Sequence, residues 1–153
     1  MPIEDIHEFI SELEKNGELK RVKTEVDSEL EIAEIMRRGM YSDGPAILFE
    51  NVKGFDMPVL GNAFGSMKRL EIGLEMTDFT EIGKRITDMT KMDVPSGLLN
   101  KIKKLPELSK MTASFPKSEI KGPVTEITSS DASFDDLPIL KSWPDDAGRF
   151  ITL

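Results

Sequence analysis

The sequence predicts an α/β (α+β) fold, with a small mixed sheet covered by helices and the first strands of a further β-rich unit after it. Apolar residues recur at spacings of three and four in several windows, which is typical of amphipathic helices. Two short apolar runs, residues 46–49 and 57–60, lie between these windows and are typical of strands buried on both faces. After residue 123 the pattern changes to short apolar runs separated by acidic turns.

A helix, an edge strand and a second helix are predicted in the first part of the chain. The first helix begins near the N-terminus and ends at Gly17, which suits a left-handed turn. Residues 18–26 are highly charged and predict a strand near a sheet edge. Ser28 and Glu31 have the spacing of a capping box, which predicts a helix over residues 29–38 with Gly39 just past its end. The apolar stripe of the first helix comprises Ile3, Ile6, Phe9, Ile10 and Leu13.

Two buried strands and two further helices follow. Residues 46–49 predict a central strand and residues 57–60 a second strand. The loop from Gly61 to Ser66 leads into the next helix. Strands that alternate with helices indicate a sheet covered by helices. The predicted buried faces of the two helices are Met67, Leu70 and Leu74, and then Phe79, Ile82, Ile86 and Met89.

Pro and Gly residues suggest where the first domain ends. Phe115-Pro116 and Gly122-Pro123 are typical of a linker. We therefore expect an N-terminal α/β domain over residues 1–115, a linker over 116–123 and an incomplete β-rich unit over 124–153. The strands expected in this last unit are Val124–Ile127, Leu137–Leu140 and Phe150–Leu153.

The composition is that of a globular chain and excludes several chemistries. The 153 residues include 28 acidic and 20 basic side chains, for a net charge of −8, with one histidine and no cysteine. Disulfides, thiolate nucleophiles and iron–sulfur clusters are excluded, and one histidine cannot supply the ligand set of a catalytic zinc. The negative charge disfavours nucleic acid as a partner. We also expect no membrane span and a cytoplasmic location, because there is neither a long apolar run nor a signal peptide pattern.

The loop from Gly61 to Ser66 is a candidate anion site, because α/β folds hold anions where a strand leads into a helix. Its spacing matches neither familiar fingerprint. Two glycines four residues apart do not make G-x-G-x-x-G, and Lys68 follows Gly65 by three positions instead of one. We therefore favour a tight turn capped by Ser66 over a phosphate site.

An acidic cluster within residues 131–146 is a candidate cation site. A hard cation needs several convergent oxygens, but this cluster has no regular spacing and two prolines interrupt it, so we interpret it as a solvated turn face. A basic stretch without interleaved aromatics is interpreted as a solvated helix face, and His7, which has no evident acid–base partner, as a half-exposed helix histidine. The acidic residues are Asp131, Asp135, Asp136, Asp145 and Asp146, and the basic ones are Lys101, Lys103 and Lys104.

Four segments carry a resemblance to a known family. They are Glu-Leu-Lys-Arg at 18–21, Gly-Pro-Ala-Ile-Leu-Phe-Glu-Asn-Val-Lys-Gly at 44–54, Pro-Val-Leu-Gly-Asn-Ala-Phe-Gly-Ser at 58–66, and the run from Leu137 to Thr152 that contains Ser-Trp-Pro-Asp-Asp. Together and in this order they resemble the N-terminal part of the UbiD family of decarboxylases, of the 4-hydroxy-3-polyprenylbenzoate decarboxylase type. The resemblance spans nearly the whole chain and is weakest between about residues 77 and 118.

The resemblance implies a non-oxidative decarboxylation of an aromatic or α,β-unsaturated acid, such as a polyprenyl-hydroxybenzoate or anhydromevalonate phosphate. It implies prenylated FMN, Mn²⁺ and K⁺ as cofactors of the full-length enzyme, a flavin prenyltransferase as cofactor supplier, and a homo-oligomer. It also implies that residues 124–153 begin a split β-barrel of the flavin-reductase-like kind.

The family's metal ligands and catalytic acid–base network belong to segments that follow the strand at 150–152. No catalytic, cofactor-binding or metal residue is therefore assigned in this chain, and Thr152 is assigned no contact. We expect the chain to be inactive alone, as a scaffold part of the enzyme, and to bind no cofactor by itself. Two alternatives are a self-standing non-catalytic subunit or interaction module, and a nucleotide-binding module that uses residues 61–66.

Overall fold

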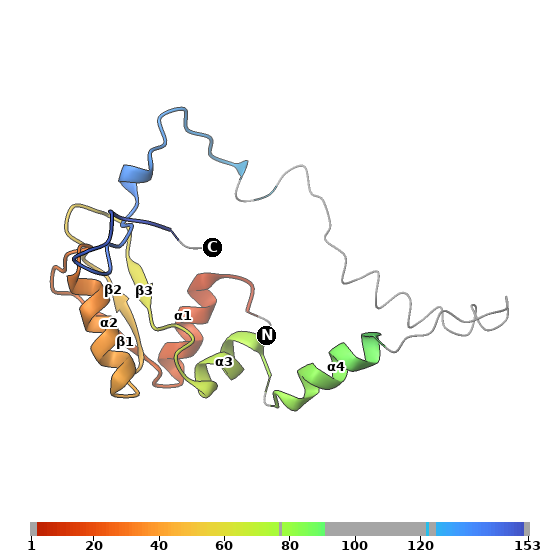
Figure 1. Cartoon of the computed structure of the whole chain (residues 1–153). Coiled ribbons are helices and arrows are strands. Elements are labelled where there is room, and N and C mark those ends of the chain that lie inside the picture. The colour runs from red at the N-terminus through yellow and green to blue at the C-terminus, as the bar shows by residue number, and fades with distance from the viewer. Residues whose placement is uncertain (1–2, 77, 91–121, 123–124, 152–153) are drawn as a thin grey trace. The chain divides into compact units, whose positions relative to one another are not determined.

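A computed structural model describes residues 3–76, 78–90, 122 and 125–151 of the chain (Figure 1). The chain divides into two compact units: Met1–Asp78 together with Asp131–Leu153, and Phe79–Ser130. The elements of the larger unit are α1 (Ile6–Lys15), β1 (Leu19–Val22), α2 (Glu31–Tyr41), β2 (Ala46–Phe49), β3 (Val59–Gly61), α3 (Met67–Leu74) and the short 3₁₀ helix η2 (Phe134–Asp136).

The larger unit is built on a mixed three-stranded sheet with the order β1-β2-β3. Strand β1 pairs with β2 in parallel, with Leu19 opposite Ala46, and β3 pairs with β2 antiparallel, with Leu60 opposite Leu48. The predicted mixed sheet is confirmed, and so is the placement of the charged strand at an edge. This strand is shorter than the predicted range of 18–26, although Val26 makes an isolated parallel bridge further along.

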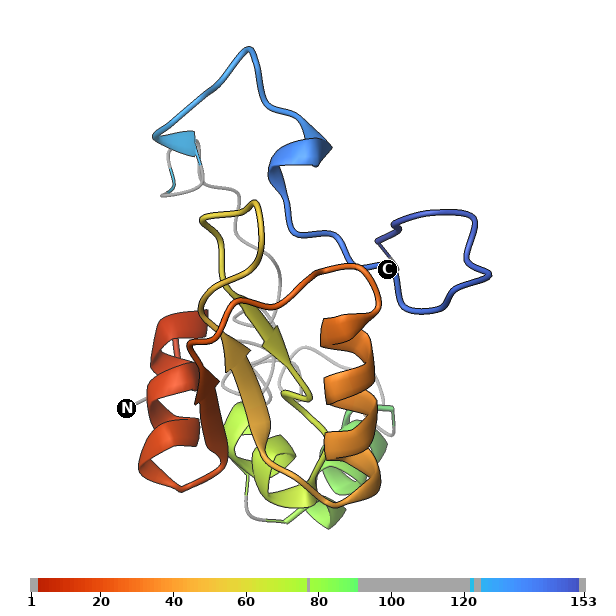
Figure 2. The ribbon, with the colours of Figure 1, turned by 90° about the vertical axis from the view of Figure 1, so that its left-hand side faces the viewer.

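Helices cover both faces of the sheet, with α1 and α2 on opposite sides in Figure 2. One core cluster joins Ile32 of α2 to Ile47 and Phe49. A second cluster, on the other face, joins Phe9 and Leu13 of α1 to Ala46, with Ile72 of α3 packed against it. Successive side chains of a strand point to opposite faces, and both faces of β2 are covered. Strand β2 is therefore buried along its whole length, as its continuous apolar run predicted.

The first helix begins later than predicted because Asp5 caps it. The Asp5 carboxylate accepts a hydrogen bond of 2.8 Å from the Glu8 amide, which sets the first helical residue at Ile6. Its end is as predicted, since Gly17 has a φ of +72°. Glycine adopts this left-handed conformation without the steric cost that a side chain adds.

The predicted capping box of α2 is wrong. Its N-cap residue is Leu30, which makes no side-chain cap. The Ser28 hydroxyl is buried and has no hydrogen-bond partner, while the Glu31 carboxylate accepts from the Asp27 amide at 2.7 Å. The helix also continues through Gly39 and ends at Tyr41, although Met40 and Tyr41 are exposed.

The predicted buried face of α3 is also wrong in part. Met67 and Leu74 are exposed, whereas Arg69 is buried with 2% of its surface accessible. Arg69 is buried because Glu18 lies within reach of its guanidinium, as described below. The smaller unit contains α4 (Thr80–Thr90), which confirms the helix predicted around residues 79–89, but Ile86 of its predicted buried face is exposed.

The strands predicted after residue 123 are not formed in the described residues. Thr125 donates to Gly122 in a local turn and Ile139 donates to Leu137 within its own segment, while one bond of 3.4 Å, from the Phe150 amide to the Leu140 carbonyl, joins two of the predicted runs without forming a ladder. Phe150 likewise makes no strand. The split β-barrel, and the division into residues 1–115, 116–123 and 124–153, stay predictions.

Candidate functional site

The loop between β3 and α3 is a tight turn held by side chains. Asn62 has a φ of +53°, and its amide group donates to the carbonyls of Gly44 and Pro45, both at 3.1 Å. The Ser66 hydroxyl accepts from the Arg69 amide at 3.2 Å, which confirms the predicted cap. The loop is therefore tied to the turn that precedes β2.

A partly buried ion pair, in which Arg69 is buried and Glu18 half-buried, lies beneath this loop. Nη1 of Arg69 is 2.9 Å from Oε2 of Glu18, and Nζ of Lys68 is 3.2 Å from Oε1 of the same carboxylate. Lys68 also donates to the carbonyl of Asn16 at the end of α1. Nε of Arg69 is buried without a hydrogen-bond partner. These contacts join α3 to the start of β1.

Glu18 stays ionised in this network. Burial by itself raises the pKa of Glu18, but hydrogen bonds from Lys68 and Arg69 outweigh it and hold the pKa below its ordinary value. Because Lys68 and Arg69 both pair with the Glu18 carboxylate, their positive charges are already neutralised and are not available to bind an anion. The geometry fits a structural tie better than the anion site weighed from the sequence.

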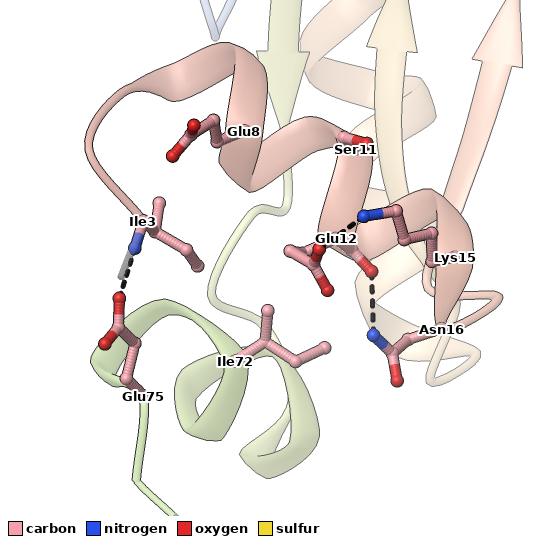
Figure 3. Close-up of a pocket in the computed structure, with 8 residues that line it drawn as sticks. All are labelled: Ile3, Glu8, Ser11, Glu12, Lys15, Asn16, Ile72 and Glu75. Atoms are coloured by element: carbon pink, nitrogen blue, oxygen red, sulfur yellow. Dashed lines mark hydrogen bonds and ion pairs between the residues drawn. The ribbon is translucent and has the colours of Figure 1, made fainter. Parts of the chain in front are cut away.

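A cavity of about 650 Å³ lies between α1 and α3 (Figure 3). Its charged side chains and Asn16 are engaged within the protein. Lys15 pairs with Glu12 at 2.6 Å, Asn16 donates to the Glu12 carbonyl at 2.8 Å, and the Glu75 carboxylate accepts from the Ile3 amide. Glu8 accepts from the Glu4 amide at 2.9 Å. These carboxylates therefore serve as backbone caps and ion pairs that hold α1.

A more apolar groove of about 550 Å³ lies beside α2. Trp143 and Met40 line it and are 59% and 60% exposed. Asp146 accepts from the Trp143 amide at 2.8 Å and from the Ser142 amide at 3.2 Å, and so shapes the loop that forms one wall. The lining residues are Leu30, Ala33, Glu34, Met36, Arg37, Met40, Ser142, Trp143 and Pro144.

The acidic residues weighed as a cation site act mainly as local caps. Asp136 accepts from the Ser133 amide at 3.2 Å, and Asp146 caps the loop just described. Asp135 and Asp136 line a cavity of about 500 Å³ with Asp56. Within residues 3–76, 78–90, 122 and 125–151, no three Asp, Glu or His side chains form a group suited to a metal ion. Asp145 is exposed, and Asp131 makes an interaction of its own.

The remaining candidates from the sequence take no part in a site that the structure describes. His7 is an exposed residue of α1, as its interpretation predicted. Thr152 and the basic stretch Lys101, Lys103 and Lys104 lie outside the described residues. In the part of the chain that the structure describes, no helix is long and apolar enough to cross a bilayer.

Sequence reasoning missed the Glu18–Arg69 pair. The available signal was an arginine three residues before Ile72, on the helical face that packs against α1. That signal is weak, because an arginine is normally expected at the surface and only the position of Glu18 makes its burial favourable.

Comparison with known proteins gives a consistent family match. Residues 10–87 match the model of the 3-octaprenyl-4-hydroxybenzoate carboxy-lyase N-terminal domain. Uncharacterized proteins of Aquifex aeolicus and Archaeoglobus fulgidus are 46% and 43% identical over 97% and 99% of this chain, and the chain spans 31% of the length of each.

A solved structure matches across most of the fold. It is an evolved dimeric form of the UbiD-class enzyme HmfF from Pelotomaculum thermopropionicum in complex with prFMN. The TM-score is 0.65 with 26% sequence identity, over 95% of this chain and 30% of that chain. The likeness therefore extends well beyond residues 10–87.

Proposed function

The chain belongs to the UbiD family of carboxy-lyases, and from that premise we propose that it is the N-terminal scaffold part of a prenylated-FMN-dependent, non-oxidative decarboxylase. The observation that carries the proposal is the match to the family's N-terminal domain model over residues 10–87. The likeness of the whole fold to a UbiD-class enzyme in complex with prFMN supports it.

The substrate we propose is an aromatic or α,β-unsaturated carboxylic acid, such as a polyprenyl-hydroxybenzoate or anhydromevalonate phosphate. Prenylated FMN, when bound, supplies the electron sink for the loss of carbon dioxide, while the protein positions the substrate and supplies acid–base groups. We assign Mn²⁺ and K⁺ to the same enzyme as further cofactors.

The described residues do not fit a cofactor site by themselves. The cations below the β3–α3 loop pair with Glu18, and the carboxylates of the α1–α3 cavity are engaged in caps and ion pairs. We therefore propose that this chain has no catalytic, flavin-binding or metal-binding residue. Its role is to present a rigid sheet with helices on both faces.

The larger arrangement is also part of the proposal. Residues 1–115 form the N-terminal α/β domain, 116–123 the linker, and 124–153 the beginning of a split β-barrel that further residues complete. The enzyme is a cytoplasmic homo-oligomer that receives its cofactor from a flavin prenyltransferase.

Co-expression tests this function. The full coding sequence that contains this chain is expressed with and without a flavin prenyltransferase, and the purified proteins are compared for flavin absorbance and for carbon dioxide release from a panel of aromatic and α,β-unsaturated acids. We expect a bound flavin and acid-dependent release only after co-expression. Equal release without the prenyltransferase would contradict the proposed cofactor, and no release with a loaded flavin would contradict the proposed acids.

The alternative is a self-standing non-catalytic subunit or interaction module. Reading the coding sequence past Leu153 separates the two. A stop codon directly after Leu153, with a stable complex between the chain and a separate protein, would favour the alternative.

A further inference from the structure

The segment Leu137–Asp146, here called the strap, is bound to the start of α2 through its backbone. The Leu30 amide donates to the Lys141 carbonyl at 2.9 Å, and the Lys141 amide donates to the Ser28 carbonyl at 3.2 Å. Glu29 and Lys141 therefore form a parallel bridge between segments far apart in the sequence. Their side chains also approach to 3.6 Å.

The corner that receives the strap is strained. Leu30 has a φ of +67° and a ψ of −39°, in the region that side chains rarely adopt. A left-handed backbone brings Cβ close to the following carbonyl, which destabilises every residue except glycine. Next to it, the Ser28 hydroxyl is fully buried without a hydrogen-bond partner. Both features lie at the residues whose backbone groups bind Lys141.

Few other contacts hold the strap. Leu140 packs against the core cluster that contains Ile32 and Phe49. The Trp143 side chain is 59% exposed, and the hydrogen bonds of Asp146 close a turn within the strap itself. Residues 137–142 are partly buried, and the Phe150 amide donates to the Leu140 carbonyl at 3.4 Å, but no residue of the strap is fully buried. The strap therefore lies lower in local stability than the fully buried strand β2.

The strap also forms one wall of the groove beside α2. Ser142, Trp143 and Pro144 of the strap face Met36 and Met40 of α2 across it. The groove therefore exists only while the strap is docked.

We propose that Leu30 and the strap form a conformational latch. When the strap is docked, its bonds to Leu30 and Ser28 act together with the local bond from the Glu31 amide to the Glu29 carbonyl (2.8 Å) to hold Leu30 at its positive φ, and the groove is formed. When the strap is released, Leu30 relaxes to an ordinary conformation and the groove loses a wall. The latch sets the exposure of the apolar surface on α2, and it does not depend on the proposed decarboxylase activity.

Substitutions at Leu30 in the full 153-residue chain test the strain. Leu30→Gly accepts a positive φ without cost, whereas Leu30→Ala removes the same side chain beyond Cβ but keeps the penalty. Amide hydrogen exchange at residue 30 and at Lys141 should be about five- to thirtyfold slower in Leu30→Gly than in Leu30→Ala. The amides of β2 serve as the reference for global unfolding. Equal exchange in the two variants, or slower exchange in Leu30→Ala, would overturn the latch.

A second pair of variants tests the docking contact. Lys141→Pro removes the amide that donates to Ser28, and Lys141→Ala keeps this amide but removes the ammonium group. Trp143 is the sole tryptophan, so acrylamide quenching of its fluorescence reports the strap directly. Quenching should increase, and protection of the Leu30 amide should be lost, in Lys141→Pro only, while exchange in β2 is unchanged. Unchanged quenching and protection in Lys141→Pro would refute the latch, as would equal effects of the two variants.

Discussion

The packing of α3 depends on the side chain of Arg69. Its surface is 2% accessible, and its guanidinium is 2.9 Å from the Glu18 carboxylate. An arginine buried in this way is favourable only with its partner, because the loss of one member leaves an uncompensated charge. The pair therefore gives specificity to the contact between α3 and β1.

Removing one partner should be costly and removing both should cost less. We expect Arg69→Leu to lower the free energy of unfolding by about 2–3 kcal/mol, because Glu18 then keeps only the exposed Lys68 as a partner. The double variant Arg69→Leu/Glu18→Leu should recover part of this loss. Urea denaturation measures both, with Lys68→Ala as the control, expected below about 1 kcal/mol. Additive losses in the double variant would contradict the role given to the pair.

Gly65 has no room for a side chain. A Cβ at this position would lie 1.8 Å from Oδ1 of Asn62 and 2.9 Å from Nη2 of Arg69. Gly65→Ala should therefore lower the free energy of unfolding by about 1–3 kcal/mol, since Asn62 is held by two backbone carbonyls. Gly148→Ala, whose Cβ would meet nothing within 4 Å, is the matched control. Equal thermal melts for the two variants would show that the loop rearranges freely.

At the scale of elements, α2 illustrates what local signals predict and what they miss. Its apolar spacing predicted the helix and the burial of Ile32. The Ser28–Glu31 spacing did not predict its start. The Asp27 carboxylate, not Ser28, accepts from the Glu29 amide, and the Leu30 amide donates to the distant Lys141 carbonyl of the strap. A contact between residues as far apart as Leu30 and Lys141 cannot be predicted from a window of ten residues.

Two glycines, Gly39 within α2 and Gly44 in the turn after it, give a matched pair of substitutions. Gly39 lies inside the helix, and a Cβ there would make an ordinary contact of 3.5 Å with Ile47. Gly39→Ala should raise the free energy of unfolding by about 0.5–1 kcal/mol through helix propensity. At Gly44 a Cβ would lie 2.9 Å from the Gly39 carbonyl oxygen, so Gly44→Ala should destabilise. Chemical denaturation compares them, and a destabilised Gly39→Ala would contradict the helical packing described.

The charges on α2 predict a pH dependence. Hydrogen bonds from Arg37, and then from Arg38, lower the pKa of Glu34 to about 2. Because this pKa is below that of the unfolded chain, the stability from Glu34 is present above the ordinary carboxyl pKa of 4.5 and is lost as the pH falls toward 2. A carboxyl ¹³C NMR titration should give a midpoint near 2, and Arg37→Gln should raise it. A midpoint near 4.5 in the unchanged chain would be inconsistent with these ion pairs.

At the scale of the whole molecule, periodicity was sufficient to predict the layered fold. The buried run at residues 46–49 and the charged strand before α2 predicted a central and an edge strand, and both are confirmed. The strands after residue 123 did not follow, because a strand needs a continuous neighbour to pair with, and the described residues there make local turns and one isolated bridge, between Lys141 and Glu29. The Glu18–Arg69 contact could not be predicted, since it depends on how α3 lies against β1.

The family assignment rests on a different kind of information. Four sequence segments resemble UbiD decarboxylases. The match of residues 10–87 to the family's N-terminal domain and the likeness to a UbiD-class structure support the same family. Spacing alone predicted neither the family nor an activity, because the segments that match have structural roles. The chain also spans 31% of the length of each of the two curated relatives described above.

The most direct test of the central claim compares this chain with the full coding sequence in one assay. Both are co-expressed with a flavin prenyltransferase, and release of labelled carbon dioxide is measured from carboxyl-labelled aromatic and α,β-unsaturated acids. We predict release from the product of the full coding sequence and none from the 153-residue chain. Equal release by the 153-residue chain alone would contradict its role as a scaffold part.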